Sequence, residues 1–247
     1  MKLPILFLSL ALFVASSFSS AEDAKPKYGP TTVPISQDHS YIRKSAAPDY
    51  WAISPFYASQ RDERSCSLAS VTMLVNAVRK ARAVQLGSED KLATQDEVLK
   101  KADDQNWTDV LTTNTHGTFK GLEALSTYIE KSLKAYGVPP KKVEFIRAED
   151  LSKKTADAVH KALVENEKSD QDFLIASFDQ FEFTQDTHVG HVAPVGAYDA
   201  AKKRVLIFDP DRQWYEPYWV PEDVFLKGLS TLDPAANKKR GLVWIKY

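Results

Sequence analysis

The sequence predicts an α+β fold, with a helical lobe first and an antiparallel sheet lobe after it. Apolar residues recur at spacings of three and four up to about residue 165, as on the buried face of a helix. Five later segments are short, rich in β-branched and aromatic residues, and bounded by turn residues, which is typical of strands. Helices followed by a run of strands indicate an α+β protein, and 247 residues suffice for one domain with a large core.

The first 21 residues have the pattern of a secretory signal peptide. Lys2 supplies a positive charge, residues 3–15 are apolar, and the small residues Ser19 and Ala21 precede the expected cleavage point. The apolar run is shorter than the ~18 residues that a membrane-spanning helix needs, and no other stretch approaches that length. We therefore expect an exported protein, periplasmic or secreted, without a membrane segment after cleavage.

Residues 22–48 are rich in Pro, Lys, Ser and Thr and show little periodic apolar content. This composition predicts an extended leader outside the folded domain. Aromatic residues arrive together from Tyr50 onward, so the folded domain is expected to cover residues 49–247.

Two helices are expected early in this domain, with a turn after them. A run almost free of charge, without Gly or Pro, follows Cys66 and predicts a buried helix of roughly four turns. Thr94 and Glu97 form a capping box, which predicts a short helix toward Ala102. The segment 103–116 is polar and indicates a turn.

Two amphipathic helices follow. One begins near Thr118 and is stopped by Gly137 and the prolines after it. The other covers residues 150–165, where His160 lies among lysines and is expected to be a solvated surface residue. The inward-facing residues of this last helix are expected to be Leu151, Ala158, Val159, Ala162 and Leu163.

Strands are expected from residue 143 onward. A short strand over 143–147 precedes the last of these helices, and a hairpin connection at 198–203 joins two later strands. The later strands are expected over 173–177, 189–197, 205–208, 214–220 and 242–247.

The balance of charge excludes one class of partner. Lysine and arginine residues number 32 and acidic residues number 33, which gives a net charge of −1. The two signs are interspersed, without a basic stripe. Nucleic acid is therefore not an expected partner.

Cys66 is the only cysteine, and it lies where a loop enters a helix. Unpaired backbone N–H groups and the positive end of the helix dipole at such a point favour a thiolate. Exported proteins usually pair their cysteines, so a lone thiol is either well buried or retained for its reactivity. Both interpretations stay open here, because a free cysteine is often just a small buried apolar residue.

His191 and Asp209 are suited to activate such a nucleophile. His191 falls inside one predicted strand and Asp209 ends the next, 18 residues later, so a hairpin would place them side by side. The imidazole would take the thiol proton and later protonate the leaving amine, while the carboxylate fixes its tautomer. Asp211 competes for the carboxylate role, but it lies in the loop after Pro210, so Asp209 is preferred.

Gln60, six residues before Cys66, is suited to stabilise an oxyanion together with the backbone N–H of the cysteine. His188 and His191 are not expected to share a zinc ion, because their odd offset puts them on opposite faces of a strand. The sequence therefore predicts a thiol site without a bound metal.

Taken together, these residues resemble the catalytic domain of phytochelatin synthase, a family of papain-like thiol enzymes. The resemblance covers roughly residues 50–229 and rests on the spacing of Gln60 from Cys66 and of His191 from Asp209. The matching segments are Cys66-Ser67-Leu68-Ala69-Ser70, Gly117-Thr118-Phe119, Gly190-His191-Val192-Ala193-Pro194-Val195-Gly196-Ala197-Tyr198, Asp209-Pro210-Asp211-Arg212 and Tyr215-Glu216-Pro217-Tyr218-Trp219-Val220-Pro221.

The resemblance implies a papain-like fold and a role for each residue. Cys66 would be the nucleophile, His191 the general base and acid, and Asp209 the orienting carboxylate. Gln60 would donate to the oxyanion, and Arg212 would hold a substrate carboxylate or brace the site. The implied reaction is attack of the cysteine on the Cys–Gly bond of glutathione, with loss of glycine. The resulting thioester would be hydrolysed to γ-glutamylcysteine or transferred to a second glutathione, giving phytochelatin.

The chain departs from the plant-type motif at Ser65 and Ser67, where that motif has an aromatic residue and a glycine. It also ends at Tyr247, without the cysteine-rich extension associated with a metal response. We therefore expect hydrolysis first and transfer second, with glutathione as partner and no cofactor required for the chemistry. Cd²⁺ or another heavy metal would act as an activator or as a thiolate complex of the substrate. A homodimer is compatible with the sequence.

Two other functions fit parts of the same pattern. A papain-like peptidase acting on longer peptides would share the four site residues and differ only in its cleft. A non-catalytic protein that binds soft metals or thiols fits less well, because soft-metal sites generally gather several thiolates. If export leaves the enzyme little glutathione, the substrate would be another γ-glutamyl thiol.

Overall fold

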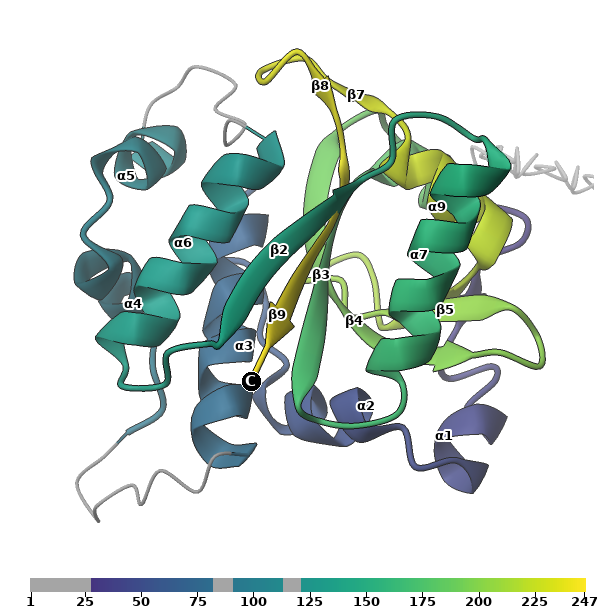
Figure 1. Ribbon diagram of the computed structural model, residues 1–247, viewed down its shortest axis with the longest axis horizontal. Coiled ribbons are helices and arrows are strands. Elements are labelled where there is room, and N and C mark those ends of the chain that lie inside the picture. The colour runs from purple at the N-terminus through teal and green to yellow at the C-terminus, as the bar shows by residue number, and fades with distance from the viewer. Residues whose placement is uncertain (1–27, 82–90, 113–120) are drawn as a thin grey trace, which may run out of the picture.

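The computed structural model describes residues 28–81, 91–112 and 121–247 and has an α+β architecture (Figure 1). N-terminal helices precede a C-terminal antiparallel sheet, so the predicted fold class is confirmed at that level. The predicted signal peptide and the expected helix start near Thr118 lie outside the described residues. Within these ranges, none of the helices combines the length and the apolar character that crossing a membrane requires.

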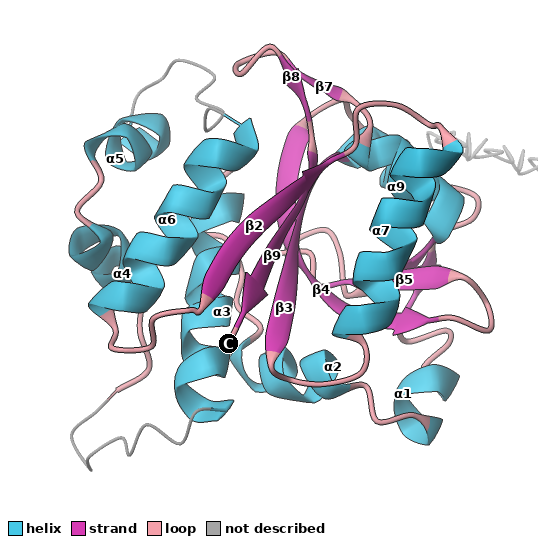
Figure 2. Ribbon diagram, viewed as in Figure 1, coloured by secondary structure: helices cyan, strands magenta, loops and turns pink. Residues whose placement is uncertain are grey.

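A seven-stranded antiparallel sheet forms the centre of the fold (Figure 2). Its strands are β1 (Val33–Pro34), β2 (Lys142–Arg147), β3 (Asp172–Asp179), β4 (Gly190–Asp199), β5 (Arg204–Ile207), β6 (Tyr218–Pro221) and β9 (Gly241–Lys246). They lie in the order β1-β6-β5-β4-β3-β9-β2, so that β9 is inserted between β3 and β2. A separate hairpin consists of β7 (Leu232–Asp233) and β8 (Lys238–Lys239).

Helices cover both faces of this sheet (Figure 1). The helices are α1 (Ser40–Lys44), α2 (Pro48–Ile53), α3 (Cys66–Ala81), α4 (Gln95–Ala102), α5 (Gln105–Thr112), α6 (Gly121–Ala135), α7 (Lys153–Asn166), α8 (Gln180–Thr184) and α9 (Glu222–Leu229), with a 3₁₀ helix, η1 (Ser54–Phe56). Helices α3 to α6 pack on one face, and α7, α8 and α9 pack on the other.

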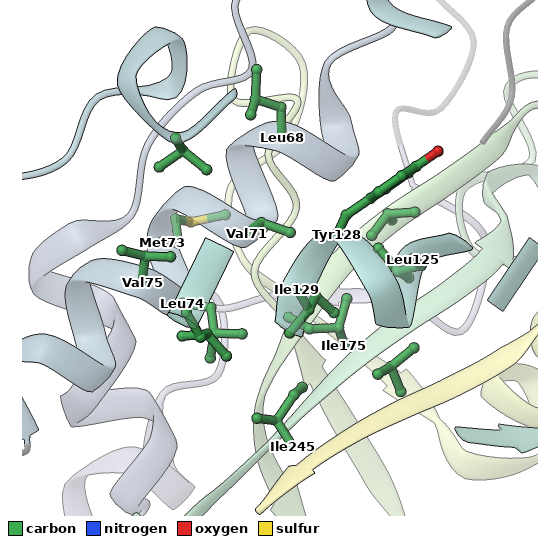
Figure 3. Packing of buried hydrophobic residues seen from close by; sticks show 14 of the residues in the cluster. Leu68, Val71, Met73, Leu74, Val75, Leu125, Tyr128, Ile129, Ile175 and Ile245 are labelled. Atoms are coloured by element: carbon green, nitrogen blue, oxygen red, sulfur yellow. The ribbon is translucent and has the colours of Figure 1, made fainter. Parts of the chain in front are cut away.

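Alternate residues of the central strands divide between two cores. On β3, Ile175 belongs to the core formed with α3 and α6, whereas Leu174 faces the core formed with α7 and α9. Figure 3 shows side chains of α3 and α6 packed near Ile175 and Ile245. Successive side chains of a strand point to opposite faces, so a strand that is apolar on both faces lies between two layers. The sheet therefore forms the middle layer of the fold.

Most of the predicted elements are present. Helix α3 starts at Cys66, and α4 carries the complete capping box of Thr94 and Glu97. Helix α6 ends before Gly137, which has a φ of +73° that glycine adopts without strain. The predicted strands correspond to β2, β3, β4, β5 and β9, and β4 and β5 form the expected hairpin.

The segment 103–116, expected to be a turn, contains α5. The Asp104 carboxylate accepts the backbone N–H of Trp107 at 3.2 Å, as a capping residue does. Trp107 and Leu111, one helical turn apart, are both buried. The prediction of a turn was wrong for the described part of this segment, because two apolar residues suffice to anchor a short helix in a polar sequence.

Three smaller differences concern element boundaries. Leu151 precedes α7 and is exposed, because the helix begins after Ser152, whose hydroxyl accepts the N–H of Thr155. Ala158 is exposed as well, whereas the other three residues expected to face inward are buried. Strand β6 is shorter than the predicted 214–220, because the preceding residues form a turn on the carbonyl of Asp211.

Residues 28–48, expected to be part of an extended leader, belong to the fold. Strand β1 pairs with β6, and the Thr32 hydroxyl donates to the carbonyl of Phe183 at 2.6 Å. The Trp219 indole N–H donates to the carbonyl of Asp38 at 2.8 Å. These partners lie more than 150 residues away in sequence, so the local composition gives no sign of them.

Candidate active site

Cys66 is the first residue of α3 and is 7% exposed. Nearly every side chain of this helix from Leu68 to Val78 is buried, so the helix is fixed on all sides. The N-terminal end of a helix carries unpaired N–H groups and the positive end of its dipole. The thiol therefore lies at a rigid position at the positive end of this helix.

Ser65 fixes the loop that leads to the thiol. Its buried hydroxyl accepts the backbone N–H groups of Arg61 and Asp62 at 3.0 Å each and donates to the Asp62 carbonyl at 3.0 Å. This serine stands where the plant-type motif has an aromatic residue. Ser65 supplies three hydrogen bonds within the loop at this position.

Ser67, the second departure from that motif, also has a buried partner. Its hydroxyl oxygen accepts the indole N–H of Trp107 at 3.1 Å, and that indole is stacked on Tyr128 with ring centroids 4.8 Å apart. A glycine at this position would leave the indole N–H without its partner. The serine thus joins α3 to α5.

A hydrogen bond joins α3 to the strand that carries the histidine. The Ser70 hydroxyl donates to the carbonyl of Val192 at 2.9 Å, and both groups are buried. Ser70 lies one turn after Cys66, and Val192 follows His191 on β4. The first turn of the helix is therefore held against this strand.

His191 and Asp209 are in direct contact. The imidazole Nε2 lies 2.7 Å from a carboxylate oxygen of Asp209, and the two side chains are 5% and 0% exposed. Asp209 follows β5, which pairs with β4, so the predicted hairpin does bring the two residues together. Because Nε2 is engaged, Nδ1 is the nitrogen left for the thiol of Cys66. Asp211 is not the partner of the imidazole; its backbone N–H donates to the Asp209 carboxylate at 2.8 Å.

The two buried groups hold each other in their charged forms. Burial alone lowers the pKa of His191, but the charge and hydrogen bond of Asp209, with a further contribution from contact with Cys66, raise it well above its usual value. Burial alone raises the pKa of Asp209, but the same pairing and the donors from Asp211 and Tyr218 hold it below its usual value. A histidine in contact with the sulfur of Cys66 and oriented by a carboxylate is the arrangement that nucleophilic thiol catalysis uses.

The second oxygen of the Asp209 carboxylate has donors of its own. The Tyr218 hydroxyl donates to it at 2.7 Å, and the Gln180 amide lies 3.4 Å from it. Neither residue was predicted to belong to the site. Tyr218 lies in a segment that carries the family resemblance, but its contact with Asp209 depends on the pairing of β6 with β5. Gln180 begins α8 and lies outside the matching segments.

Arg212 contacts the tyrosine Tyr57. Its guanidinium donates to the backbone carbonyl of Tyr57 at 3.0 Å and stacks over the same ring at 4.5 Å. The Tyr57 hydroxyl in turn donates to the backbone carbonyl of Asp209 at 2.6 Å. Arg212 and Tyr57 also line an aromatic cavity of about 570 Å³. Arg212 was expected either to hold a substrate carboxylate or to brace the site. These contacts are the ones that a bracing residue would make.

The backbone of Gln60 is hydrogen-bonded to the residue that follows Asp209, just after the end of β5. Its N–H donates to the carbonyl of Pro210 at 2.7 Å. Its side-chain oxygen is buried without a hydrogen-bond partner among the described residues. The backbone of Gln60 is therefore held beside the strand end that carries Asp209.

Arg240 is a buried cation beside the site that the sequence analysis missed. It is 5% exposed, and its guanidinium lies so close to Gly190 that a Cβ there would approach it to 2.8 Å. Burial lowers its pKa, while the charges of Asp233, Asp179 and Cys66 offset part of that effect. Its buried Nε has no partner in the described ranges. The residue follows two lysines in the sequence, so it resembles part of an ordinary surface run.

The two histidines near β4 take different partners. The His188 Nδ1 lies 3.0 Å from the Asp179 carboxylate, and its ring is stacked on Phe181 at 3.9 Å. Within the described ranges, His, Cys, Asp and Glu side chains form no group of three or more that could hold a metal ion.

Residues 36–242 match the family model described as phytochelatin synthase. The match begins inside the segment expected to be a leader, in agreement with the packing of that segment.

Several curated plant proteins are similar to this chain. Glutathione gamma-glutamylcysteinyltransferase 1 of Arabidopsis thaliana is 33% identical over 104 residues, which cover 42% of this chain and 21% of the relative. The protein of the same description from Lotus japonicus is 24% identical over 204 residues, which cover 83% of this chain and 37% of the relative. The corresponding protein of Triticum aestivum is 38% identical over 72 residues, or 29% of this chain and 14% of the relative. The chain therefore spans well under half the length of these relatives.

Proposed function

Because the chain belongs to the phytochelatin synthase family, we propose that it is a papain-like thiol enzyme that cleaves glycine from glutathione. The observation that carries the proposal is the buried ion pair of His191 and Asp209 in contact with Cys66 at the start of α3. The names of the plant relatives support the choice of substrate, since each is called a glutathione gamma-glutamylcysteinyltransferase.

The first half-reaction forms a thioester on Cys66. Nδ1 of His191 takes the thiol proton, and the sulfur attacks the carbonyl carbon of the Cys–Gly peptide bond. The negative charge on the carbonyl oxygen is stabilised by the backbone N–H of Cys66 and by the amide of Gln60. The imidazolium then protonates the nitrogen of glycine, the C–N bond breaks, and a γ-glutamylcysteinyl group remains on the sulfur.

The second half-reaction releases this group. Attack by water, with His191 as general base, gives γ-glutamylcysteine, whereas attack by the amino group of a second glutathione gives phytochelatin. Transfer needs a second binding position for an anionic acceptor, while hydrolysis needs only water. We therefore propose hydrolysis as the main outcome and transfer as the lesser one.

Arg240 is suited to bind one carboxylate of the substrate. Glutathione carries two carboxylates, and a guanidinium binds such a group with two parallel hydrogen bonds. The buried Nε without a partner supplies one of these donors. For Arg212 we propose the bracing role, through Tyr57.

A heavy metal would enter this reaction with the substrate. Soft ions such as Cd²⁺ bind thiolates, and the chain has one cysteine, which is the nucleophile. We propose that such an ion is carried as a thiolate complex of glutathione. We also propose export to the periplasm or the medium, from the pattern of residues 1–21.

The test is mass spectrometry of the mature protein after incubation with glutathione, with and without Cd²⁺. The expected result is a γ-glutamylcysteinyl adduct on Cys66 with release of free glycine, both lost in Cys66→Ala. The ratio of γ-glutamylcysteine to phytochelatin then separates hydrolysis from transfer. Absence of adduct and glycine under both conditions would rule out glutathione, and peptide libraries would then test the papain-like peptidase. Glycine release that survives Cys66→Ala would refute the nucleophile.

A further inference from the structure

We propose that Tyr218 is a positioning residue that acts on the nucleophile through Asp209. The inference deepens the proposed function, since it rests on the same triad, but it concerns a residue to which the mechanism assigns no step. Tyr218 would hold the carboxylate ionised and in one orientation, and so set the pH range in which the thiolate and imidazolium coexist.

The geometry gives each oxygen of the carboxylate a separate set of donors. Oδ1 receives the imidazole of His191 at 2.7 Å and the N–H of Asp211 at 2.8 Å. Oδ2 receives the Tyr218 hydroxyl at 2.7 Å, with the Gln180 amide at 3.4 Å. The distance to Gln180 is at the limit of a hydrogen bond, so the tyrosine is the main donor to this oxygen.

Burial makes this donor important. Asp209 and Tyr218 are both 0% exposed, so water does not replace a lost hydrogen bond there. A buried carboxylate that lacks donors is stabilised by taking up a proton instead. A protonated Asp209 would no longer attract the imidazolium of His191, and the thiolate would lose its partner.

The fold keeps Tyr218 in place as a donor. Its strand, β6, pairs with β5, where Ile207 lies opposite the tyrosine two residues before Asp209. The edges of Tyr28 and Tyr215 pack against its ring with centroids 5.7 and 6.0 Å away. Burial and the nearby carboxylate raise the pKa of Tyr218 well above its usual value, so the hydroxyl keeps its proton.

Other titratable groups also surround the carboxylate, from several elements. Their contributions must be the same in all variants that are compared. They are His191 on β4, Tyr57 after η1, Tyr28 before β1, Tyr215 in the turn before β6, and Cys66 through the imidazole.

The decisive variant is Tyr218→Phe, which removes one hydroxyl and keeps the ring. We expect the acid limb of the pH profile for alkylation of Cys66 by iodoacetamide to move up by about one pH unit, because the ionised carboxylate loses a hydrogen bond. With glutathione as substrate, kcat should fall roughly tenfold while KM stays unchanged, because Tyr218 does not touch the substrate.

Tyr198→Phe is the matched control. Tyr198 is also a buried tyrosine whose hydroxyl donates to a carboxylate, but that carboxylate is Glu222 and not Asp209. Its alkylation profile should superimpose on that of the wild type. Thermal unfolding of both variants identifies any general loss of stability.

A double-mutant cycle with Asp209→Asn separates positioning from a structural role. In the Asn background no carboxylate charge is present for the hydroxyl to stabilise, so Tyr218→Phe should shift the alkylation limb no further. If the effect of Tyr218→Phe were purely structural, the variant would shift the alkylation limb by the same amount with and without Asp209→Asn. If Tyr218→Phe does not fold, Gln180→Met removes the weaker donor to the same oxygen and should move the limb in the same direction by less.

Three results would overturn the proposal. One is a Tyr218→Phe profile that matches the wild type in a folded protein, and another is an additive cycle. The third result applies if Tyr218→Phe does not fold. It is an alkylation profile of Gln180→Met whose acid limb matches that of the wild type. Alkylation does not use glutathione, so a shifted limb without glycine release would leave Tyr218 as a positioning residue and refute only the substrate.

Discussion

The backbone N–H of Gln60 donates to the carbonyl of Pro210 across 2.7 Å, so the loop before Cys66 is tied to the residue after Asp209. This bond uses only main-chain atoms. Side-chain substitutions at Gln60 can therefore remove its amide without releasing the loop.

Gln60→Ala should lower kcat for glycine release by about a hundredfold or more, with little change in KM, because an oxyanion donor acts only in the transition state. The measurement is steady-state kinetics with glutathione. Gln95→Ala is the control, since its amide donates to the carbonyl of Ser59 on the same loop at 2.8 Å. Equal losses in both variants would indicate a disturbed loop and contradict an oxyanion role.

Arg240→Met should raise KM for glutathione by roughly tenfold to a hundredfold, because a charged hydrogen bond to the substrate is lost. Arg240→Lys should recover part of the affinity, since it keeps the charge without the paired donors. Lys238→Met is the control: this lysine is exposed and pairs with Glu123 at 2.7 Å, away from the thiol. An unchanged KM in a folded Arg240→Met protein would refute substrate binding.

Arg212→Met distinguishes the two roles expected for that residue. As a brace for Tyr57, Arg212 should affect kcat by about fivefold and leave KM unchanged, because it acts through the hydroxyl that holds the backbone of Asp209. Tyr57→Phe should then show the same pattern. A KM that rises in Arg212→Met but not in Tyr57→Phe would instead assign the arginine to the substrate.

The buried carboxyl group of Asp49 should make the free energy of unfolding depend on pH, independently of any catalytic role. It is 1% exposed, and neither carboxylate oxygen has a hydrogen-bond partner among the described residues. Burial raises its pKa well above the usual value; the nearby Asn166 side chain offsets part of this, and the charges of Asp172 and Glu167 add to the rise.

The direction in which the free energy of unfolding changes with pH follows from proton binding. A carboxyl whose pKa is higher in the folded protein than in the unfolded chain binds more protons when folded, so the free energy of unfolding falls as pH rises between those two values. Asp49→Asn is neutral at every pH and should be more stable than the wild type by at least about 1 kcal/mol at pH 8. The gain should shrink toward pH 4. Urea unfolding at several pH values measures it, and a gain that is independent of pH would contradict the assignment.

The sequence predicts the parts of the site that local pattern and one hairpin can place. Cys66 precedes a continuous apolar helix, and His191 and Asp209 lie on strands joined by a short turn, so their contact follows from neighbouring elements. Tyr218 and Arg240 are different. Their positions depend on which strands lie side by side across the sheet, and that order is set by packing between segments far apart in the chain.

The same reason explains the helix missed at α5 and the packing of residues 28–48. Strand β1 has two residues and α1 has five, too few for a periodic pattern. What holds this segment is a set of single contacts, such as the N–H of Ile35 on the carbonyl of Pro217 at 2.8 Å. Such contacts depend on the distant residue that completes them, so the sequence of the segment itself does not reveal them.

The place of β9 in the sheet has a consequence for the order of events during synthesis. Strand β9 is the last of the described strands to be made, yet it is the neighbour that joins β2 to β3, and Arg240 directly precedes it. Helix α3, which begins at Cys66, emerges from the ribosome long before this strand. Pairings between such distant segments form slowly, because a long loop must close first. The sulfur of Cys66 therefore gains its complete surroundings only when the sheet is finished, and a nascent chain should show no turnover.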